Sequence, residues 1–317
     1  MKIVVLDGHV ASGDDLGWDA LAALGDLTVY DRTIPDQIAE RAADAEAVFV
    51  NKVVLDAAVF DSLPALRFVG VLATGFNNVD VVAARRRGVV VCNVPAYSTN
   101  SVVQTIFALL LTITNRVELH SASVHSGDWV NCPDFSYRLT PLPELSGATM
   151  GIYGLGHIGS SVANIARAFG MKVIALTSKV PWQLPAYIHP VEREELLRAS
   201  DVLVLCAPLT AQNKYFINAE ALSMMKPSAI LINTARGGLV DSYALAKALE
   251  ENRLYAAGID VMESEPPRAD DPLLTAPRCF ITPHYAWQGE NARRELLRIS
   301  ADNLAAYIAG RPVNVVN

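Results

Sequence analysis

The sequence predicts an α/β protein built from two doubly wound lobes, each a parallel sheet with helices on both faces. Three observations support this fold class. Short runs rich in valine, isoleucine and leucine alternate with segments of helical periodicity along the chain. The length of 317 residues suits about two domains. A glycine-rich turn of the kind that approaches phosphates lies in the middle of the chain.

The first lobe takes shape from alternating strand-like and helical runs over roughly the first 95 residues. No glycine turn of the phosphate-binding kind occurs there, so we expect this lobe not to be the cofactor domain. The expected strands are Lys2 to Leu6, Leu27 to Tyr30, Ala47 to Val50, Phe68 to Val71 and Val89 to Cys92, with helices near Leu16 to Leu24, Pro35 to Ala43, Asp56 to Leu63 and Val81 to Arg87.

A long apolar helix is expected next. Ser101 and Gln104 have the spacing of a capping box, which predicts that the helix begins at Ser101 and runs to about Asn115. The helix is hydrophobic all round, which indicates burial and suits a bridge between two domains. A loop rich in aspartate, proline and aromatic residues follows, from Asp128 to Leu142.

The second lobe begins with a strand, the glycine turn and a helix that stops at Gly170. A final helix after His284 carries an apolar stripe and ends at Gly310, and we expect it to return to the first lobe. The further strands expected in the second lobe are Lys172 to Leu176, Val202 to Cys206, Ala229 to Asn233, Ala256 to Val261 and Cys279 to Thr282.

The turn from Gly154 to Gly159 has the pattern G-x-G-x-x-G, with a strand before it and a helix after it. Gly154 allows the tight turn, Gly156 lets the backbone approach a pyrophosphate, and Gly159 lets helix and strand pack closely. The N-terminus of the helix presents free N–H groups to the anion. We therefore expect a dinucleotide site, the alternative being a merely tight turn.

Composition limits the function classes. A net charge of −7 disfavours nucleic acid or an anionic membrane as the main partner. The apolar run at the N-terminus is too short for a signal peptide, and the run from Ile106 to Ile113 reads as a buried helix. The four cysteines have no paired spacing, so we expect core thiols in a reducing cytoplasm and no metal site.

Polar residues directly follow the last strands of the second lobe. Arg236, Asp260, Glu265 and His284 should converge at one sheet edge beside the nucleotide, because ligands bind beyond the carboxyl ends of parallel strands. A guanidinium, an imidazole and a carboxylate suit hydride transfer to or from a 2-oxo acid. Taken singly, the histidine could be a hydrogen-bonded core residue, the arginine an interdomain ion pair and Glu265 a turn cap.

These motifs carry a resemblance that spans nearly the whole chain. The sequence resembles the D-isomer-specific 2-hydroxyacid dehydrogenase family, and most its glycerate dehydrogenase (hydroxypyruvate reductase) branch. The matching segments are Leu6-Asp7-Gly8 with Gly13-Asp14 and Trp18, Ala73 to Asp80, Val94 to Thr99, Trp129 with Pro133-Asp134-Phe135, the glycine turn, Asn233 to Gly237, and Pro283 to Trp287.

The resemblance implies catalytic roles for Arg236, Glu265 and His284, and a discontinuous substrate domain. That domain is a flavodoxin-like lobe of residues 1–98 and 286–317, into which a Rossmann NAD(P)-binding domain of residues 99–285 is inserted. It also implies a homodimer formed through the cofactor domain, with the loop after Asp128 at that interface or over the active site. The expected substrate-binding residues are Asn51, Lys52, Thr74, Gly75 and Trp287, and the expected cofactor-binding residues are Gly154, Gly156, His157, Ile158, Gly159, Thr177, Ser178, Lys179, Cys206, Pro208, Thr234, Ala235 and Asp260, the last holding the nicotinamide carboxamide.

One position departs from the pattern of an NAD-preferring enzyme. Such enzymes usually carry Asp or Glu after the second strand of the cofactor unit, where it binds the adenosine ribose and repels a 2′-phosphate. Here that position is Thr177, followed by Ser178 and Lys179. Either NADP(H) is accepted, or Thr177 simply hydrogen-bonds the ribose and Lys179 is solvated.

The sequence thus predicts an NAD(P)-dependent oxidoreductase that interconverts a small 2-oxo acid and its D-2-hydroxy acid. The expected substrates are hydroxypyruvate and D-glycerate, or glyoxylate and glycolate. One alternative is a different 2-oxo acid within the same family. The other is a non-catalytic protein that senses NAD(H).

Overall fold

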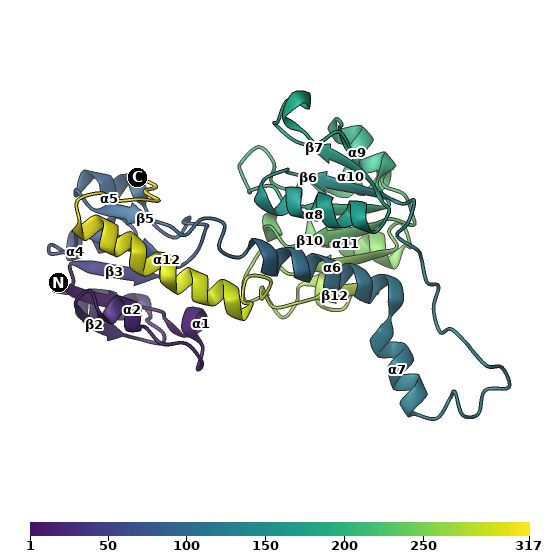
Figure 1. Ribbon diagram of the computed structural model, residues 1–317, viewed down its shortest axis with the longest axis horizontal. Coiled ribbons are helices and arrows are strands. Elements are labelled where there is room, and N and C mark those ends of the chain that lie inside the picture. The colour runs from purple at the N-terminus through teal and green to yellow at the C-terminus, as the bar shows by residue number, and fades with distance from the viewer. The chain divides into compact units, whose positions relative to one another are not determined.

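The computed structural model describes all 317 residues. The chain divides into two compact units, one formed by Met1–Ser98 with Gln288–Asn317 and the other by Thr99–Trp287. Each unit contains one parallel sheet with helices on both of its faces (Figure 1). This is the doubly wound α/β fold that the sequence predicts.

The sheet of the first unit has five parallel strands in the order β2-β1-β3-β4-β5. The chain starts at β1, moves to one side to form β2 and then returns to the other side for β3. A ligand crevice is expected at such a reversal, between the loops that follow β1 and β3. The strands are β1 (Lys2–Val5), β2 (Asp26–Val29), β3 (Ala47–Val50), β4 (Phe68–Val71) and β5 (Val90–Cys92).

Helices cover this sheet on both faces. On one face, α3, α4 and α5 enclose a core with Val4, Val48 and Val69. On the other face lies the long C-terminal helix α12, whose Tyr307 ring packs 5.2 Å from that of Phe68 (Figure 1). The helices are α1 (His9–Ser12), α2 (Asp19–Ala22), α3 (Ile38–Arg41), α4 (Ala57–Ser62), α5 (Val81–Arg86) and α12 (Glu290–Ile308).

The first two helical predictions in this unit were too long. The segment expected to be helical near Leu16 to Leu24 forms only the single turn of α2, and the segment from Pro35 divides into a 3₁₀ turn and α3. Helices this short have little stability of their own and are held by packing against the sheet. The residues after Gly310 extend along β5, where the backbone N–H of Val316 donates to Val91 O at 2.9 Å.

The sheet of the second unit has seven parallel strands in the order β12-β11-β10-β9-β6-β7-β8. Its reversal lies at β6, which has β7 on one side and β9 on the other. The strands are β6 (Thr149–Tyr153), β7 (Lys172–Leu176), β8 (Ile188–Pro190), β9 (Val202–Leu205), β10 (Ile230–Asn233), β11 (Ala256–Ile259) and β12 (Cys279–Ile281). Strand β8 was not predicted, because it has three residues and ends in a proline, which only an edge strand tolerates.

Two layers of helices enclose this sheet. Helices α6 and α8 pack on one face, and α9, α10 and α11 pack on the other. Helix α7 and the loop that follows it project away from the sheet (Figure 1). The bounds are α6 (Thr99–Asn115), α7 (Val117–His125), α8 (His157–Ala168), α9 (Arg193–Ala199), α10 (Ala219–Met224) and α11 (Ser242–Glu250).

The predicted start of α6 is wrong. The helix begins at Thr99, and Ser101 lies inside it, where its hydroxyl donates to Ala286 O at 2.5 Å instead of capping the helix. Because the Ser101 hydroxyl donates to another loop, it does not cap the helix.

No single helix of the protein is long and apolar enough to cross a membrane. Only α6 and α7 together reach that length and composition, as a pair bent by 52°, and the apolar residues of α6 are buried in the core.

Candidate active site

All seven strands of the second unit run in one direction, so the loops that follow them meet at one edge of the sheet. Every residue of this unit that the sequence predicts to be functional lies in or beside one of these loops. Gly154 follows β6, Thr177 follows β7, and Cys206 follows β9, while the loops after β10, β11 and β12 carry Arg236, Glu265 and His284 respectively.

The glycine turn has the geometry expected of each of its glycines. Gly154 has φ +93°, and a Cβ there would lie 2.7 Å from Ala207 N, so the turn requires glycine. A Cβ on Gly159 would overlap the carbonyl oxygen of Gly154, which explains how closely α8 approaches the turn. A Cβ on Gly156 would meet no atom within 4 Å. Fold and packing therefore do not require glycine at 156, whereas a pyrophosphate approaching the backbone would.

Residues around this turn fit a dinucleotide. Gly156 is the N-cap of α8, so the first N–H groups of a twelve-residue helix point out of the turn. His157 is exposed there and Ile158 is half-buried. On the neighbouring loops, Cys206 and Pro208 follow β9, and Thr234 and Ala235 follow β10. Burial raises the pKa of the Cys206 thiol to about 12, so the thiol stays protonated at neutral pH.

The loop after β7 carries no carboxylate. Thr177 is half-buried, and Ser178 and Lys179 are exposed. Thr177 Oγ1 accepts a hydrogen bond from the backbone N–H of Lys179 at 3.2 Å, so the threonine hydroxyl proton remains available to a ligand. This loop can therefore donate hydrogen bonds to a ribose or to a phosphate, and no acidic side chain within it repels the phosphate.

The turn that carries Arg236 is shaped by Asn233 at the end of β10. The Asn233 amide is fully buried, donates to Arg236 O at 2.9 Å and accepts from the Ala235 N–H at 3.1 Å. A Cβ on Gly237 would overlap the carbonyl group of Met262, so this turn is pressed against the loop after β11. Arg236 itself is exposed, and its guanidinium is available to a planar carboxylate.

Glu265 and His284 form a pair that bridges the loops after β11 and β12. His284 Nδ1 lies 2.6 Å from Glu265 Oε2, and the two side chains are 27% and 30% exposed. Glu265 Oε1 also accepts the backbone N–H of Met262 at 3.1 Å, so the glutamate bridges a turn and orients the imidazole at once. With Nδ1 fixed as the donor to a carboxylate, Nε2 is the ring atom left for a substrate.

Asp260 holds the backbone turn around His284. Its buried carboxylate accepts from the Thr282 hydroxyl at 2.6 Å and from the N–H groups of Tyr285 and Ala286 at 3.1 Å each. The turn brings His284 into the left-handed region, at φ +52°. Burial raises the pKa of the Asp260 carboxyl. One oxygen receives two donors and the other receives one, which leaves a single acceptor position for a carboxamide.

The first unit has a loop cluster of its own at the carboxyl edge of its sheet. Asp7, which follows β1, accepts the backbone N–H groups of Asn51, Lys52 and Val53 at 2.7, 2.5 and 2.9 Å. Asn51 is buried and Lys52 is exposed. Thr74 follows β4, and its hydroxyl donates to the carbonyl oxygen of Val94, in the loop after β5, at 2.8 Å.

Sequence reasoning missed the supporting residues of both clusters. Asp7 and Thr282 lie in segments that match the family. Their roles become clear only from the hydrogen bonds of the structure, in which Asp7 accepts three backbone N–H groups and Thr282 donates to Asp260. Gly75 follows Thr74 in its loop, and Trp287 ends the second unit three residues after His284. Sequence reasoning also assigned no role to Lys214, Tyr215 and Glu263, whose side chains contact one another.

A doubly wound parallel sheet with a glycine turn of this geometry and a histidine–carboxylate pair at the same sheet edge is typical of nicotinamide-dependent oxidoreductases. The family model of the D-isomer specific 2-hydroxyacid dehydrogenase NAD binding domain matches residues 107–286. The chain belongs to this family, and it is an enzyme that acts on 2-hydroxy acids.

Named relatives match most or all of the chain. It is 44% identical to a hydroxypyruvate reductase of Blautia hydrogenotrophica over 100% of both chains, and 40% identical to a glycerate dehydrogenase of Methylorubrum extorquens over 89% of this chain and 88% of the relative. Among solved structures, an acyclic imino acid reductase in complex with NADPH and D-Arg superimposes with a TM-score of 0.87 at 28% identity, with 100% of both chains covered.

Proposed function

We propose that this dehydrogenase reduces hydroxypyruvate to D-glycerate and glyoxylate to glycolate, and catalyses the reverse reactions. The observation that carries the proposal is the His284–Glu265 pair, at the same edge of the sheet as the dinucleotide turn. Relatives named hydroxypyruvate reductase, glycerate dehydrogenase and glyoxylate reductase support these substrates.

A nicotinamide cofactor held by the glycine turn from Gly154 to Gly159 would supply the hydride for the carbonyl carbon in the direction of reduction. Arg236 binds the substrate carboxylate and polarises the oxo group with its guanidinium. His284 Nε2 donates a proton to the carbonyl oxygen as it becomes a hydroxyl. Glu265 stabilises the imidazolium before transfer and keeps Nδ1 protonated afterwards. In the oxidation direction the neutral imidazole takes the hydroxyl proton.

Substrate-binding roles are also proposed for residues of the first unit. The backbone around Thr74 and Gly75 receives the substrate carboxylate, with Asn51 and Lys52 nearby. The Asp7 carboxylate supports this assignment, because it fixes the backbone from 51 to 53 through three hydrogen bonds. In the second unit, Trp287 forms part of the pocket wall, close in sequence to His284.

The test is initial-rate oxidation of NADH and NADPH with hydroxypyruvate, glyoxylate and pyruvate. We expect His284→Gln to lose at least about a hundredfold in kcat, within the range for general acid catalysis. His189→Gln is the matched control, since His189 is an exposed histidine on β8, at the opposite edge of the same sheet from β12. Full activity in His284→Gln would refute the acid-base assignment, and turnover with pyruvate alone would refute the substrates.

For the cofactor, we propose that NADPH is accepted as well as NADH. The absence of a carboxylate after β7 and the free hydroxyl proton of Thr177 support this. Ser178 and Lys179 supply further donors to a 2′-phosphate. Thr177→Asp should raise the KM for NADPH at least tenfold and leave that for NADH within about threefold, because a carboxylate repels the phosphate and accepts from the ribose. Equal effects on both cofactors would argue against the assignment.

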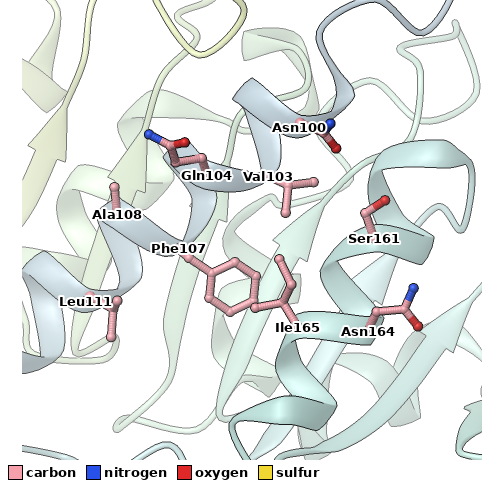
Figure 2. Close-up of a pocket in the computed structure, with 9 residues that line it drawn as sticks. All are labelled: Asn100, Val103, Gln104, Phe107, Ala108, Leu111, Ser161, Asn164 and Ile165. Carbon is pink, nitrogen blue, oxygen red and sulfur yellow. The ribbon is translucent and has the colours of Figure 1, made fainter. Parts of the chain in front are cut away.

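We also propose that the enzyme is a homodimer formed through the cofactor unit. The projecting α7 and the loop after it expose large apolar side chains, including Val130 at 87% and Phe135 at 92%. A second apolar feature is the groove between α6 and α8, where Phe107 and Ile165 face each other (Figure 2). Exposed apolar features of this size support an interface with a second copy of the chain.

Light scattering tests the dimer. The wild type should have twice the chain mass, and Phe135→Asp should shift it towards the monomer, while Ile34→Asp in the first unit should remain dimeric. A monomeric wild type would refute the proposal.

A cytoplasmic location is proposed as well, supported by four cysteines that form no disulfide.

A further inference from the structure

Three side chains outside the catalytic set meet beside the loop that carries Glu265. Lys214 and Tyr215 lie at the end of the loop after β9, and Glu263 lies in the loop after β11. The Tyr215 hydroxyl lies 2.8 and 3.0 Å from the two carboxylate oxygens of Glu263, and Lys214 Nζ lies 3.1 Å from one of them. The lysine ammonium is also 4.7 Å from the centre of the tyrosine ring. Two loops are thus joined through one carboxylate.

A short path of contacts leads from this carboxylate to the catalytic pair. Glu263 is two residues before Glu265. The backbone just before Glu263 is restrained at Met262, whose N–H donates to Glu265 Oε1 at 3.1 Å and whose carbonyl is packed against Gly237. Glu265 Oε2 in turn holds His284 Nδ1 at 2.6 Å. A shift of the loop at Glu263 would therefore displace the carboxylate that orients the imidazole.

Tyr215 is itself held in place by backbone contacts. Its N–H donates to Gly238 O at 2.8 Å, in the turn after β10. Its φ is +53°, a left-handed conformation that a tyrosine adopts at a cost and keeps only where its surroundings enforce it. The tyrosine hydroxyl is thus presented from a fixed position, which an ordinary solvent-exposed side chain does not have.

We propose that Tyr215 and Lys214 are positioning residues for catalysis, which act by holding Glu263 and thereby the Glu265–His284 pair. The proposal rests on the proposed function, because it assigns the two residues to the acid-base pair of that reaction. The alternative is a plain surface ion pair, which contributes little to stability and nothing to catalysis. Tyr215 contacts both Glu263 in the loop after β11 and Gly238 in the turn after β10, so it connects its own loop to two others. This connection favours the positioning role.

The expected signature is a change in the pH profile. Two carboxylates lie close to His284: that of Glu265, with Oε2 2.6 Å from Nδ1, and that of Asp260, which interacts with the histidine electrostatically. When Glu265 is less well placed, the imidazolium is less stabilised, so activity in the reduction direction should fall off at a lower pH. For Tyr215→Phe we expect this shift, a loss of about three- to tenfold in kcat, and an NADPH KM within about twofold of wild type.

The experiment measures kcat and KM for hydroxypyruvate reduction from about pH 5 to pH 9. The variants are Tyr215→Phe and Lys214→Met, which keep the side-chain volume, and Tyr243→Phe is the control, an exposed tyrosine on α11. A double-mutant cycle with Glu263→Gln adds a second readout. Once Glu263 has lost its charge, removal of the tyrosine hydroxyl should have little further effect.

Two negative results are distinguishable when His284→Gln is measured alongside. If His284→Gln is inactive but Tyr215→Phe has an unmoved pH profile, or acts independently of Glu263→Gln, the positioning role is overturned and the proposed function stands. If His284→Gln retains activity, the proposed function fails, and the positioning role fails with it.

Discussion

The replacement of Gly156 by alanine separates a cofactor-binding glycine from a structural one. Gly156 has φ −78° and ψ −156°, which alanine also adopts, and the added Cβ would meet no protein atom within 4 Å. We therefore expect the free energy of unfolding to change by less than about 0.5 kcal/mol. A pyrophosphate lying against this backbone would meet the new methyl group, and overpacking of this size costs about 1–3 kcal/mol. The dissociation constants of NADH and NADPH should rise by about 5- to 150-fold.

Gly159→Ala is the matched structural variant in the same turn. Its Cβ would overlap the carbonyl oxygen of Gly154, so the helix must move away from the turn and the protein should lose about 1–3 kcal/mol of stability. Urea unfolding gives the stability of both variants, and quenching of tryptophan fluorescence on titration with each cofactor gives the affinity. Unchanged cofactor affinity in Gly156→Ala would show that the pyrophosphate does not lie at this turn.

Three further predictions concern carboxylates outside the catalytic pair. Asp7→Asn should lower the free energy of unfolding in urea by about 1–3 kcal/mol, since an amide nitrogen would face a backbone N–H; stability equal to that of the wild type would contradict this. Asp260→Asn should lower kcat at least tenfold with little change in hydroxypyruvate KM, because the N–H groups of the turn that carries His284 lose a carboxylate acceptor; an unchanged kcat would count against it. The Tyr215 hydroxyl holds the pKa of Glu263 below its usual range, so this contact stabilises the fold at neutral pH and is lost as acid protonates Glu263. The Tm of Tyr215→Phe should therefore lie below that of the wild type at pH 7, and the difference should shrink as the pH falls below about 4 and Glu263 becomes protonated.

Much of the fold could be predicted from the sequence, because its strands are buried on both faces and appear as continuous apolar runs. Ala47 to Val50 and Lys172 to Leu176 have the predicted bounds. The predictions failed where tertiary contacts decide. The single turns of α2 and α3 depend on packing against the sheet, and Ser101 donates to a loop distant in sequence instead of capping α6. Such partners leave no local pattern.

The same division holds for the candidate site. Topology alone placed Arg236, Glu265 and His284 at one edge, because parallel strands end on the same side. The 2.6 Å contact between Glu265 and His284 needed coordinates, and so did the contacts of Tyr215. The left-handed conformation of Tyr215 could not be predicted either. Glycine or asparagine at that position would have indicated it, but tyrosine does not.

The two units stabilise their loops with the same device. In each, an aspartate after one strand accepts three hydrogen bonds from the loop after the adjacent parallel strand: Asp7 beside β3, and Asp260 beside β12. The donors require an ionised carboxylate, while burial disfavours the charge and raises both pKa values. Each raised pKa means that the folded state binds the proton more tightly than the unfolded chain does, so ionisation at neutral pH reduces stability. An apolar side chain in place of either aspartate would pack against the loop without fixing the direction of its N–H groups. A buried carboxylate that reduces stability is therefore typical of positions where the geometry of a loop serves function.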